Sequence, residues 1–124
     1  PGGALIDDWM QKHTGQLYDL QGHTAATGHI ETRLVKKWLG HPFFQQPLPK
    51  SLDRQTFYSC LEDCQNISLA DGAATLTAFT VEAIKQALAT CSSVREIILT
   101  GGGRHNLYMK ELLSQDFNVT VAED

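Results

Sequence analysis

The chain has 124 residues, of which 42% are hydrophobic and 19% are charged, and its formal net charge is −4. This length predicts one domain or one piece of a larger fold, and the charge offers no basic field for nucleic acid or an anionic membrane. No run of about 18 apolar residues and no charged-then-apolar leader stands in the sequence, so neither a membrane span nor a signal peptide is predicted.

Two helices are predicted in the first 40 residues. "ALIDDWMQKHTG" has the 3.6-residue apolar rhythm of a helix that ends at "TG". The segment "YDLQGHTAATG", residues 18–28, is predicted to be a loop. "HIETRLVKKWLG" is predicted to be a second helix with Gly40 as its C-cap. Its apolar stripe consists of Ile30, Leu34, Val35 and Trp38.

The middle of the chain contains a proline-rich segment and two cysteines. "HPFFQQPLPKSLDRQ", residues 41–55, holds closely spaced prolines and is predicted to be a fixed, extended segment. Cys60 and Cys64 are four residues apart and can share one helix face. Together with Cys91 they form no CxxC pair, which favours buried, reduced thiols in a cytoplasm over a disulfide framework or a metal site.

The strongest periodicity predicts one helix of about five turns between Leu76 and Cys91, with Asp71 as its N-cap. "EIILT" is a continuous apolar run typical of a strand buried on both faces. "NLYMKELLSQ" then predicts a helix, and the alternation in "FNVTV" predicts another strand. Residues 95–121 are therefore predicted to form a βαβ unit.

Three glycines, Gly101, Gly102 and Gly103, connect the first strand of this unit to its helix. Such a turn lies at the carboxyl end of a strand, where open α/β sheets bind ligands, and the next helix offers unpaired N–H groups to an anion. The spacing matches neither GxGxxG nor GxxxxGK[ST]. The pattern alone therefore fits a ligand-contacting loop and a tight helix–strand turn equally well.

Four blocks of the sequence together resemble a known family. They are "PGGALIDDW", "HPFFQQPLPKSLDRQTF", "DGAATLTAFT" and "IILTGGGRHNLYMKELL". Their order and spacing are similar to those of the bacterial anhydro-N-acetylmuramic acid kinases, in the acetate and sugar kinase/Hsp70/actin superfamily. The resemblance implies an α/β fold, the ribonuclease H-like (actin-like ATPase) C-terminal domain, truncated here, with helices packed on a mostly parallel or mixed sheet.

The family resemblance also implies an activity. Such a kinase opens the 1,6-anhydro ring of anhydro-N-acetylmuramic acid with water and phosphorylates O6 from ATP and Mg²⁺, during cell-wall recycling in the cytoplasm. The implied partners are ATP, the anhydro amino sugar, a missing N-terminal domain and a second copy in a homodimer, with no nucleic acid and no membrane. The alternative is a non-catalytic nucleotide-binding or dimerisation module of the same fold.

The resemblance implies that the chain, residues 1–124, is a single domain from the central to C-terminal part of a two-domain kinase. Pro1 and Gly2 match the family motif D-x-G-P-G-N, whose aspartate is the general base. That aspartate is therefore expected upstream of Pro1, no catalytic or metal-binding residue is assigned in this chain, and the piece is expected to be inactive alone. Gly3 departs from the asparagine of the motif.

The family's G-G-G-x-x-N motif implies that Gly101, Gly102, Gly103 and Asn106 contact the nucleotide. Asn106 is equally suited to cap the helix that follows it.

Pro1, Gly2, Lys50, Ser51 and Arg54 are implied to face the substrate or phosphate. Lys50, Ser51 and Arg54 match the family's P-P-K-S-T-G-R-E, but Leu52, Asp53 and Gln55 depart from it. The alternative for the two basic residues is a surface lysine and an arginine paired with Asp53.

Three further residues match family motifs and have structural alternatives. Asp71 and Thr75 match D-x-x-A-T-L-T, and helix capping is the interpretation favoured for Asp71. Asp7 matches the first motif, and it also fits the first turn of a helix, where a negative charge is favourable.

Overall fold

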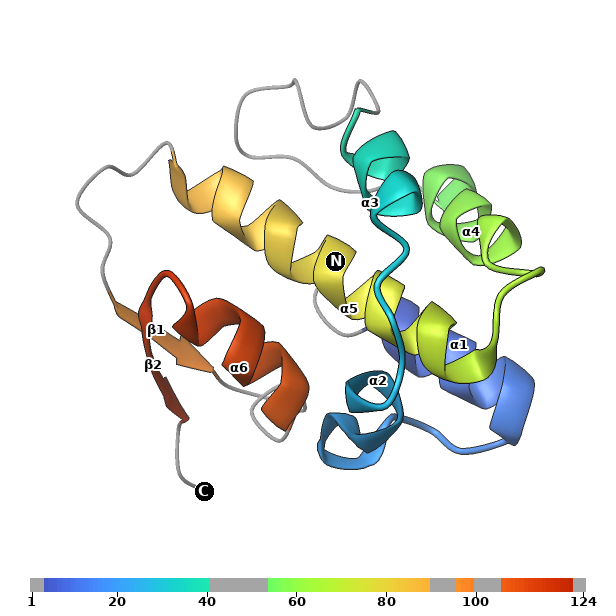
Figure 1. Ribbon diagram of the computed structural model, residues 1–124, viewed down its shortest axis with the longest axis horizontal. Helices are drawn as coiled ribbons and strands as arrows, with labels where there is room; N and C mark the ends of the chain where they lie inside the picture. The colour runs from blue at the N-terminus through green and yellow to red at the C-terminus, as the bar shows by residue number, and fades with distance from the viewer. Residues whose placement is uncertain (1–3, 41–53, 90–95, 100–105, 122–124) are drawn as a thin grey trace.

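The computed structural model describes residues 4–40, 54–89, 96–99 and 106–121. Its elements follow the chain from blue to red in Figure 1. They are α1 (Ala4–Thr14), η1 (Leu20–Gly22), α2 (His23–Ala26), α3 (Thr32–Leu39), α4 (Arg54–Asp63), α5 (Leu69–Ala89), β1 (Glu96–Leu99), α6 (Leu107–Ser114) and β2 (Asn118–Val121).

Helix α5 forms the centre of the described structure, and α1, α2, α3 and α6 all pack against it. The sequence predicted this helix with one apolar stripe, but residues 72–81 are buried on every side. The hydroxyls of Thr75, Thr77 and Thr80 tolerate this burial because each donates to the carbonyl four residues earlier, at 2.7–2.9 Å. A helix covered by neighbours on all sides has no need of a polar face.

The start of α5 differs from the prediction. The helix begins at Leu69, so Asp71 lies inside its first turn and is not its N-cap. Ser68 precedes the helix, and its Oγ accepts from the N–H of Asp71 at 3.1 Å, as an N-cap side chain does. The Asp71 carboxylate instead accepts from the N–H of His29 at 2.8 Å. It therefore connects α5 to the loop before α3.

Helix α1 is confirmed, and its apolar residues enter the core. Trp9 is 1% exposed, and its indole N–H donates to the carbonyl of Leu69 at 3.0 Å. The indole ring lies directly against Gly72 of α5. The missing side chain at Gly72 is what allows the two helices to approach so closely.

Helix α3 is confirmed with a shorter stripe. Leu34, Val35 and Trp38 are buried, whereas Ile30 precedes the helix and is 37% exposed. Gly40 is the C-cap as predicted, in a right-handed conformation that any residue can adopt.

Two regions contain helices where none was predicted. Residues 18–28, predicted as a loop, include η1 and α2. Residues 54–63, which follow the proline-rich segment, form α4, so Arg54 and Gln55 belong to a helix and not to an extended segment. The rest of that segment, residues 41–53, lies outside the described residues, as do Cys91 and the three glycines.

The Cys60 and Cys64 side chains are buried and free, as predicted. They pack in the core with Leu61. Among the described residues, no group of histidines, cysteines and carboxylates is arranged to hold a metal ion.

The βαβ unit is confirmed. β1 pairs with β2 in parallel, with Ile97 opposite Val119, and α6 connects them and packs on β2 and α5. Within the described residues the sheet has two strands, and most described helices pack on α5. The predicted arrangement of helices packed on a sheet is therefore seen only for α6 in this part of the chain.

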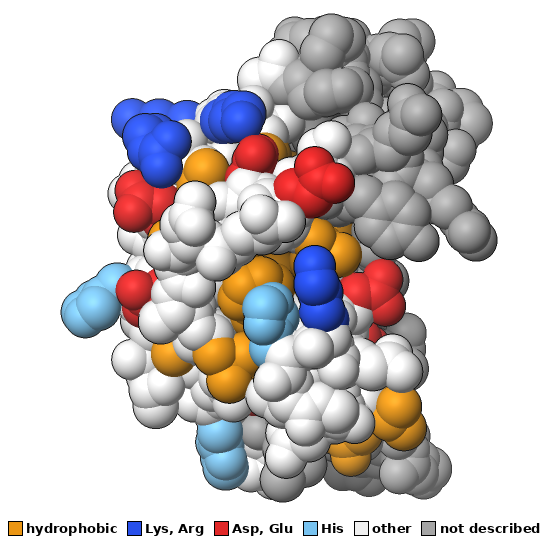
Figure 2. Space-filling model, turned by 90° about the vertical axis from the view of Figure 1, so that its right-hand side faces the viewer, with side chains coloured by type: hydrophobic (Ala, Val, Ile, Leu, Met, Phe, Trp, Pro, Cys, Tyr) orange, Lys and Arg blue, Asp and Glu red, His pale blue; other side chains and the backbone are white. Residues whose placement is uncertain are grey.

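Figure 2 shows the face of the molecule at the right of Figure 1, with positive and negative side chains close to one another. Among the described helices, none has both the length and the apolar character that a membrane crossing requires.

Candidate functional site

The start of α6 is the candidate site, because it follows the carboxyl end of parallel strand β1. Of the residues predicted to contact ligand, Asn106 is described with its side chain. Gly101, Gly102, Gly103, Lys50, Ser51, Pro1 and Gly2 lie outside the described residues. Arg54 opens α4, and its backbone is described but its side chain is not.

Asn106 is the N-cap of α6. Its backbone is extended, with φ −86° and ψ 95°, and its Oδ1 accepts from the N–H of Met109 at 2.9 Å. Its carbonyl accepts from the N–H of Lys110 at 3.1 Å, which closes the first turn. Oδ1 thus satisfies one of the N–H groups that a helix leaves unpaired at its start.

The two ends of the Asn106 amide differ in their contacts. The residue is 8% exposed, and no described residue is hydrogen-bonded to its Nδ2. The cap therefore fixes the position of the amide at the start of α6.

Residues from the first half of the chain pack against the start of α6. Gly22, with φ 73°, lies so close to the Oδ1 of Asn106 that an added Cβ would collide with it. The same Cβ would stand 2.9 Å from the Cβ and the backbone nitrogen of Tyr108. η1 and α2 both pack against α6.

Asp19 holds this packing segment together. Its carboxylate is 5% exposed and accepts from the N–H groups of Thr24 and Ala25, both at 2.9 Å. Asp19 therefore caps α2 although three residues separate it from the helix. Sequence reasoning missed Asp19 and Gly22. The available signal was an aspartate followed three residues later by a glycine, which is typical of a structured turn and not of an open loop.

The electrostatics of the site are mild. Burial, followed by the charge of Glu111, raises the pKa of Tyr108, so its hydroxyl stays protonated at neutral pH. The first turn of α6 contains no acidic residue, and its unpaired N–H groups leave a partial positive charge at this end. The arrangement can donate hydrogen bonds to a neutral or negative ligand.

The other residues singled out in the sequence lie elsewhere. Thr75 Oγ1 accepts from the N–H of Glu31 at 2.9 Å, so it supports the same loop as Asp71. Asp7 is exposed in the first turn of α1, where partial burial and the neighbouring Asp8 raise its pKa. Neither Asp7 nor Thr75 is brought to Asn106 by a described contact.

A hollow of about 390 Å³ lies between α1 and α4. Its described lining consists of Asp8, Gln11, Lys12, Leu61 and Glu62. None of these residues belongs to α6, and charges of both signs occur among them. The hollow is therefore separate from the site at Asn106.

Comparisons with known proteins agree with the motifs. A family profile described as anhydro-N-acetylmuramic acid kinase matches residues 1–123. The anhydro-N-acetylmuramic acid kinase of Gluconobacter oxydans is 46% identical over 127 residues, which cover 100% of this chain and 34% of that protein. Kinases of the same name from Zymomonas mobilis and Rhizorhabdus wittichii are 41% and 40% identical, over 98% and 97% of this chain and 33% of each relative. The chain spans about a third of the length of the curated relatives it matches.

Proposed function

Because the chain belongs to the anhydro-N-acetylmuramic acid kinase family, we propose that it forms part of an ATP-dependent kinase that opens the 1,6-anhydro ring of anhydro-N-acetylmuramic acid with water and phosphorylates O6. The product is N-acetylmuramic acid 6-phosphate, in cytoplasmic cell-wall recycling. The relatives are about three times as long as this chain, which supports its role as one part of a larger protein. In the proposal it is the central to C-terminal part of a two-domain protein that pairs as a homodimer.

In this proposal the chain supplies the nucleotide side of the site. The parallel β1–α6–β2 unit is consistent with the ribonuclease H-like, actin-like ATPase fold, whose ligands bind at the carboxyl ends of strands. Gly101, Gly102 and Gly103 let the backbone approach adenosine, and Asn106 donates to it from Nδ2. Pro1, Gly2, Lys50, Ser51 and Arg54 face the sugar or the phosphates. The general base in this proposal is the aspartate of the family motif D-x-G-P-G-N, three residues upstream of the position of Pro1, and the chain alone is expected not to turn over.

ATP carries the phosphoryl group in this scheme, and Mg²⁺ accompanies it. The start of α6 fits the nucleotide because it offers hydrogen-bond donors and a partial positive charge. The described residues contain no cluster of side chains that could hold a metal ion, so we assign no Mg²⁺ ligand among them. The single observation that carries the nucleotide role is Asn106, whose Oδ1 caps α6 after the carboxyl end of β1, at the position of the family's G-G-G-x-x-N motif.

The test separates the two ends of the Asn106 amide. Asn106→Ser retains an N-cap oxygen but lacks the amide donor, whereas Asn106→Ala lacks both. With ATP and Mg²⁺ titrated into the full-length protein by calorimetry, Asn106→Ser should raise the Kd for ATP about 2- to 10-fold without lowering the melting temperature. Gly102→Val should abolish binding while the circular dichroism spectrum stays unchanged.

Two other results would change the conclusion. An unaltered Kd for ATP in both Asn106→Ser and Gly102→Val would rule out the assigned nucleotide site. Tight ATP binding by a protein that forms no 6-phosphate from anhydro-N-acetylmuramic acid would favour the alternative, a non-catalytic nucleotide-binding module of the same fold.

A further inference from the structure

We propose that Asp19 and Gly22 are positioning residues that orient Asn106 toward the nucleotide, an inference that rests on the proposed function. The segment from Asp19 to Gly22 is called the positioning turn below. It lies far from Asn106 in sequence and touches it in the fold.

The positioning turn has an unusual backbone that its surroundings hold in place. Gln21 and Gly22 both have positive φ, at 54° and 73°, and Gln21 is one of the residue types that rarely adopt this conformation. The N–H of Gly22 donates to the carbonyl of Asp19 at 3.1 Å, and the Asp19 carboxylate accepts the two N–H bonds that start α2. Such strained residues persist where neighbouring contacts determine the conformation, often at ligand sites.

The contact between the turn and Asn106 involves the atom that caps α6. Gly22 packs against Oδ1, which the N–H of Met109 also contacts. Oδ1 lies between the backbone of Gly22 and the N–H of Met109 at the start of α6. The amide plane therefore has little freedom to rotate, and this fixes the direction in which Nδ2 points. A side chain at position 22 would push Oδ1 away, because its Cβ would overlap that atom and also crowd Tyr108.

Gly15 provides a matched control. It also has a positive φ, 78°, but a Cβ built there meets no atom within 4 Å. Gly15→Ala and Gly22→Ala therefore share the backbone strain of alanine at positive φ, and they differ in the collision with Asn106 and the crowding of Tyr108. A difference between the two variants isolates the effect of the positioning turn.

The experiment measures steady-state kinetics of the full-length kinase with each substrate varied in turn. Gly22→Ala is expected to raise the KM for ATP at least 5-fold and to leave the KM for the anhydro-sugar within 2-fold, whereas Gly15→Ala leaves both constants unchanged. In an Asn106→Ser background, whose shorter side chain removes the collision with Oδ1 but not the crowding of Tyr108, Gly22→Ala is expected to raise the KM for ATP by a smaller factor than it does in the parent protein. A purely structural role would affect both substrates alike.

The proposal is overturned if Gly22→Ala raises the KM for ATP no more than Gly15→Ala does. Should Gly22→Ala fail to fold, Asp19→Asn is the second test, because it weakens one of the two hydrogen bonds from Asp19 that cap α2. It is expected to raise the KM for ATP at least 2-fold and to leave the KM for the anhydro-sugar unchanged. An unchanged value for that variant overturns the proposal as well. The assigned nucleotide site fails separately, when Asn106→Ser and Gly102→Val both leave the KM for ATP unaltered.

Discussion

Gly72 lies against the indole ring of Trp9 at the point where α1 crosses α5. In an isolated helix, replacing glycine with alanine is favourable by about 1 kcal/mol. Here the new Cβ would overlap the six-membered part of a ring that is 1% exposed and held by a hydrogen bond to Leu69. The sign of the effect is therefore decided by packing and not by helix propensity.

Gly72→Ala is predicted to destabilise the protein by about 1–3 kcal/mol, the range typical of overpacked cores. Denaturant unfolding monitored by tryptophan fluorescence measures this change. The same substitution in a Trp9→Phe background should be less destabilising, because the smaller ring leaves space for the methyl group. A Gly72→Ala protein as stable as the parent would contradict the close approach of α1 and α5.

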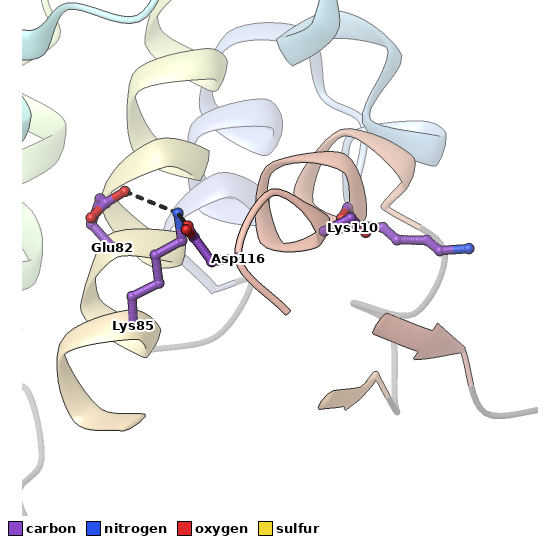
Figure 3. Close-up of polar contacts among 5 residues, drawn as sticks. Glu82, Lys85, Lys110 and Asp116 are labelled. Atoms are coloured by element: carbon purple, nitrogen blue, oxygen red, sulfur yellow. Dashed lines mark hydrogen bonds and ion pairs between the residues drawn. The ribbon is translucent and has the colours of Figure 1, made fainter. Parts of the chain in front are cut away.

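At the level of elements, the end of α6 is connected to α5 by an ion pair. Lys85 of α5 contacts the Asp116 carboxylate, which follows α6, and also lies 3.5 Å from Glu82 (Figure 3). Burial lowers the pKa of Lys85, but its hydrogen bonds to Asp116 and Glu82 and their charges outweigh burial, so the pKa is raised. A raised lysine pKa means that the contribution to stability is fully present at neutral pH and is lost as the pH rises through the folded-state pKa.

Lys85→Met is predicted to lower the free energy of unfolding by less than about 1 kcal/mol, since Asp116 is half exposed and exposed pairs are weak. About 1 M salt should reduce this difference through screening. Lys110→Met is the control: Figure 3 shows Lys110 extending from α6 away from this group, so its replacement should leave stability and its salt dependence unchanged. An equal loss in both variants would argue against the ion pair as a connection between α5 and α6.

The elements differ in how far the sequence revealed them. α1, α3, α5 and β2 were predicted because their apolar residues recur with a clear period, and β1 because its apolar run is continuous. α4 and α2 were missed. α4 directly follows a proline-rich segment, and α2 has only four residues and is capped by the carboxylate of Asp19, which lies outside the usual N-cap position.

The candidate site was predictable only in part. Asn106 was predicted as a helix cap because its motif is local, a glycine triplet followed by a capping residue, and the cap is confirmed. Its contact with a nucleotide stays a prediction. The positioning turn was not found, because the contact between Gly22 and Asn106 arises from tertiary packing that no local pattern indicates.

The core of the described structure contains two thiols, Cys60 of α4 and Cys64 directly after the end of that helix. Cys60 and Cys64 are 1% and 0% exposed, and burial raises the pKa of each to about 12, with Asp63 adding to the effect. The ordinary value of a free thiol in the unfolded chain is 9.0. The folded state therefore retains two protons over a range of pH in which the unfolded state has lost them.

This difference makes overall stability fall in alkali. Between about pH 9 and 12 the unfolded state binds fewer protons than the folded state, so the free energy of unfolding decreases as the pH rises, by at most about 1.4 kcal/mol per pH unit for each thiol. Denaturant unfolding at pH 8, 9, 10 and 11 measures this slope. The double variant Cys60→Ala/Cys64→Ala is expected to be less stable at pH 8, from lost packing, but to decline less steeply with pH. Parallel curves for the two proteins would mean that the thiols ionise equally in both states and are open to solvent.

A thiol-specific reagent gives an independent measure: at pH 8 both cysteines should react only as fast as the molecule unfolds, because their thiolates do not form in the closed core.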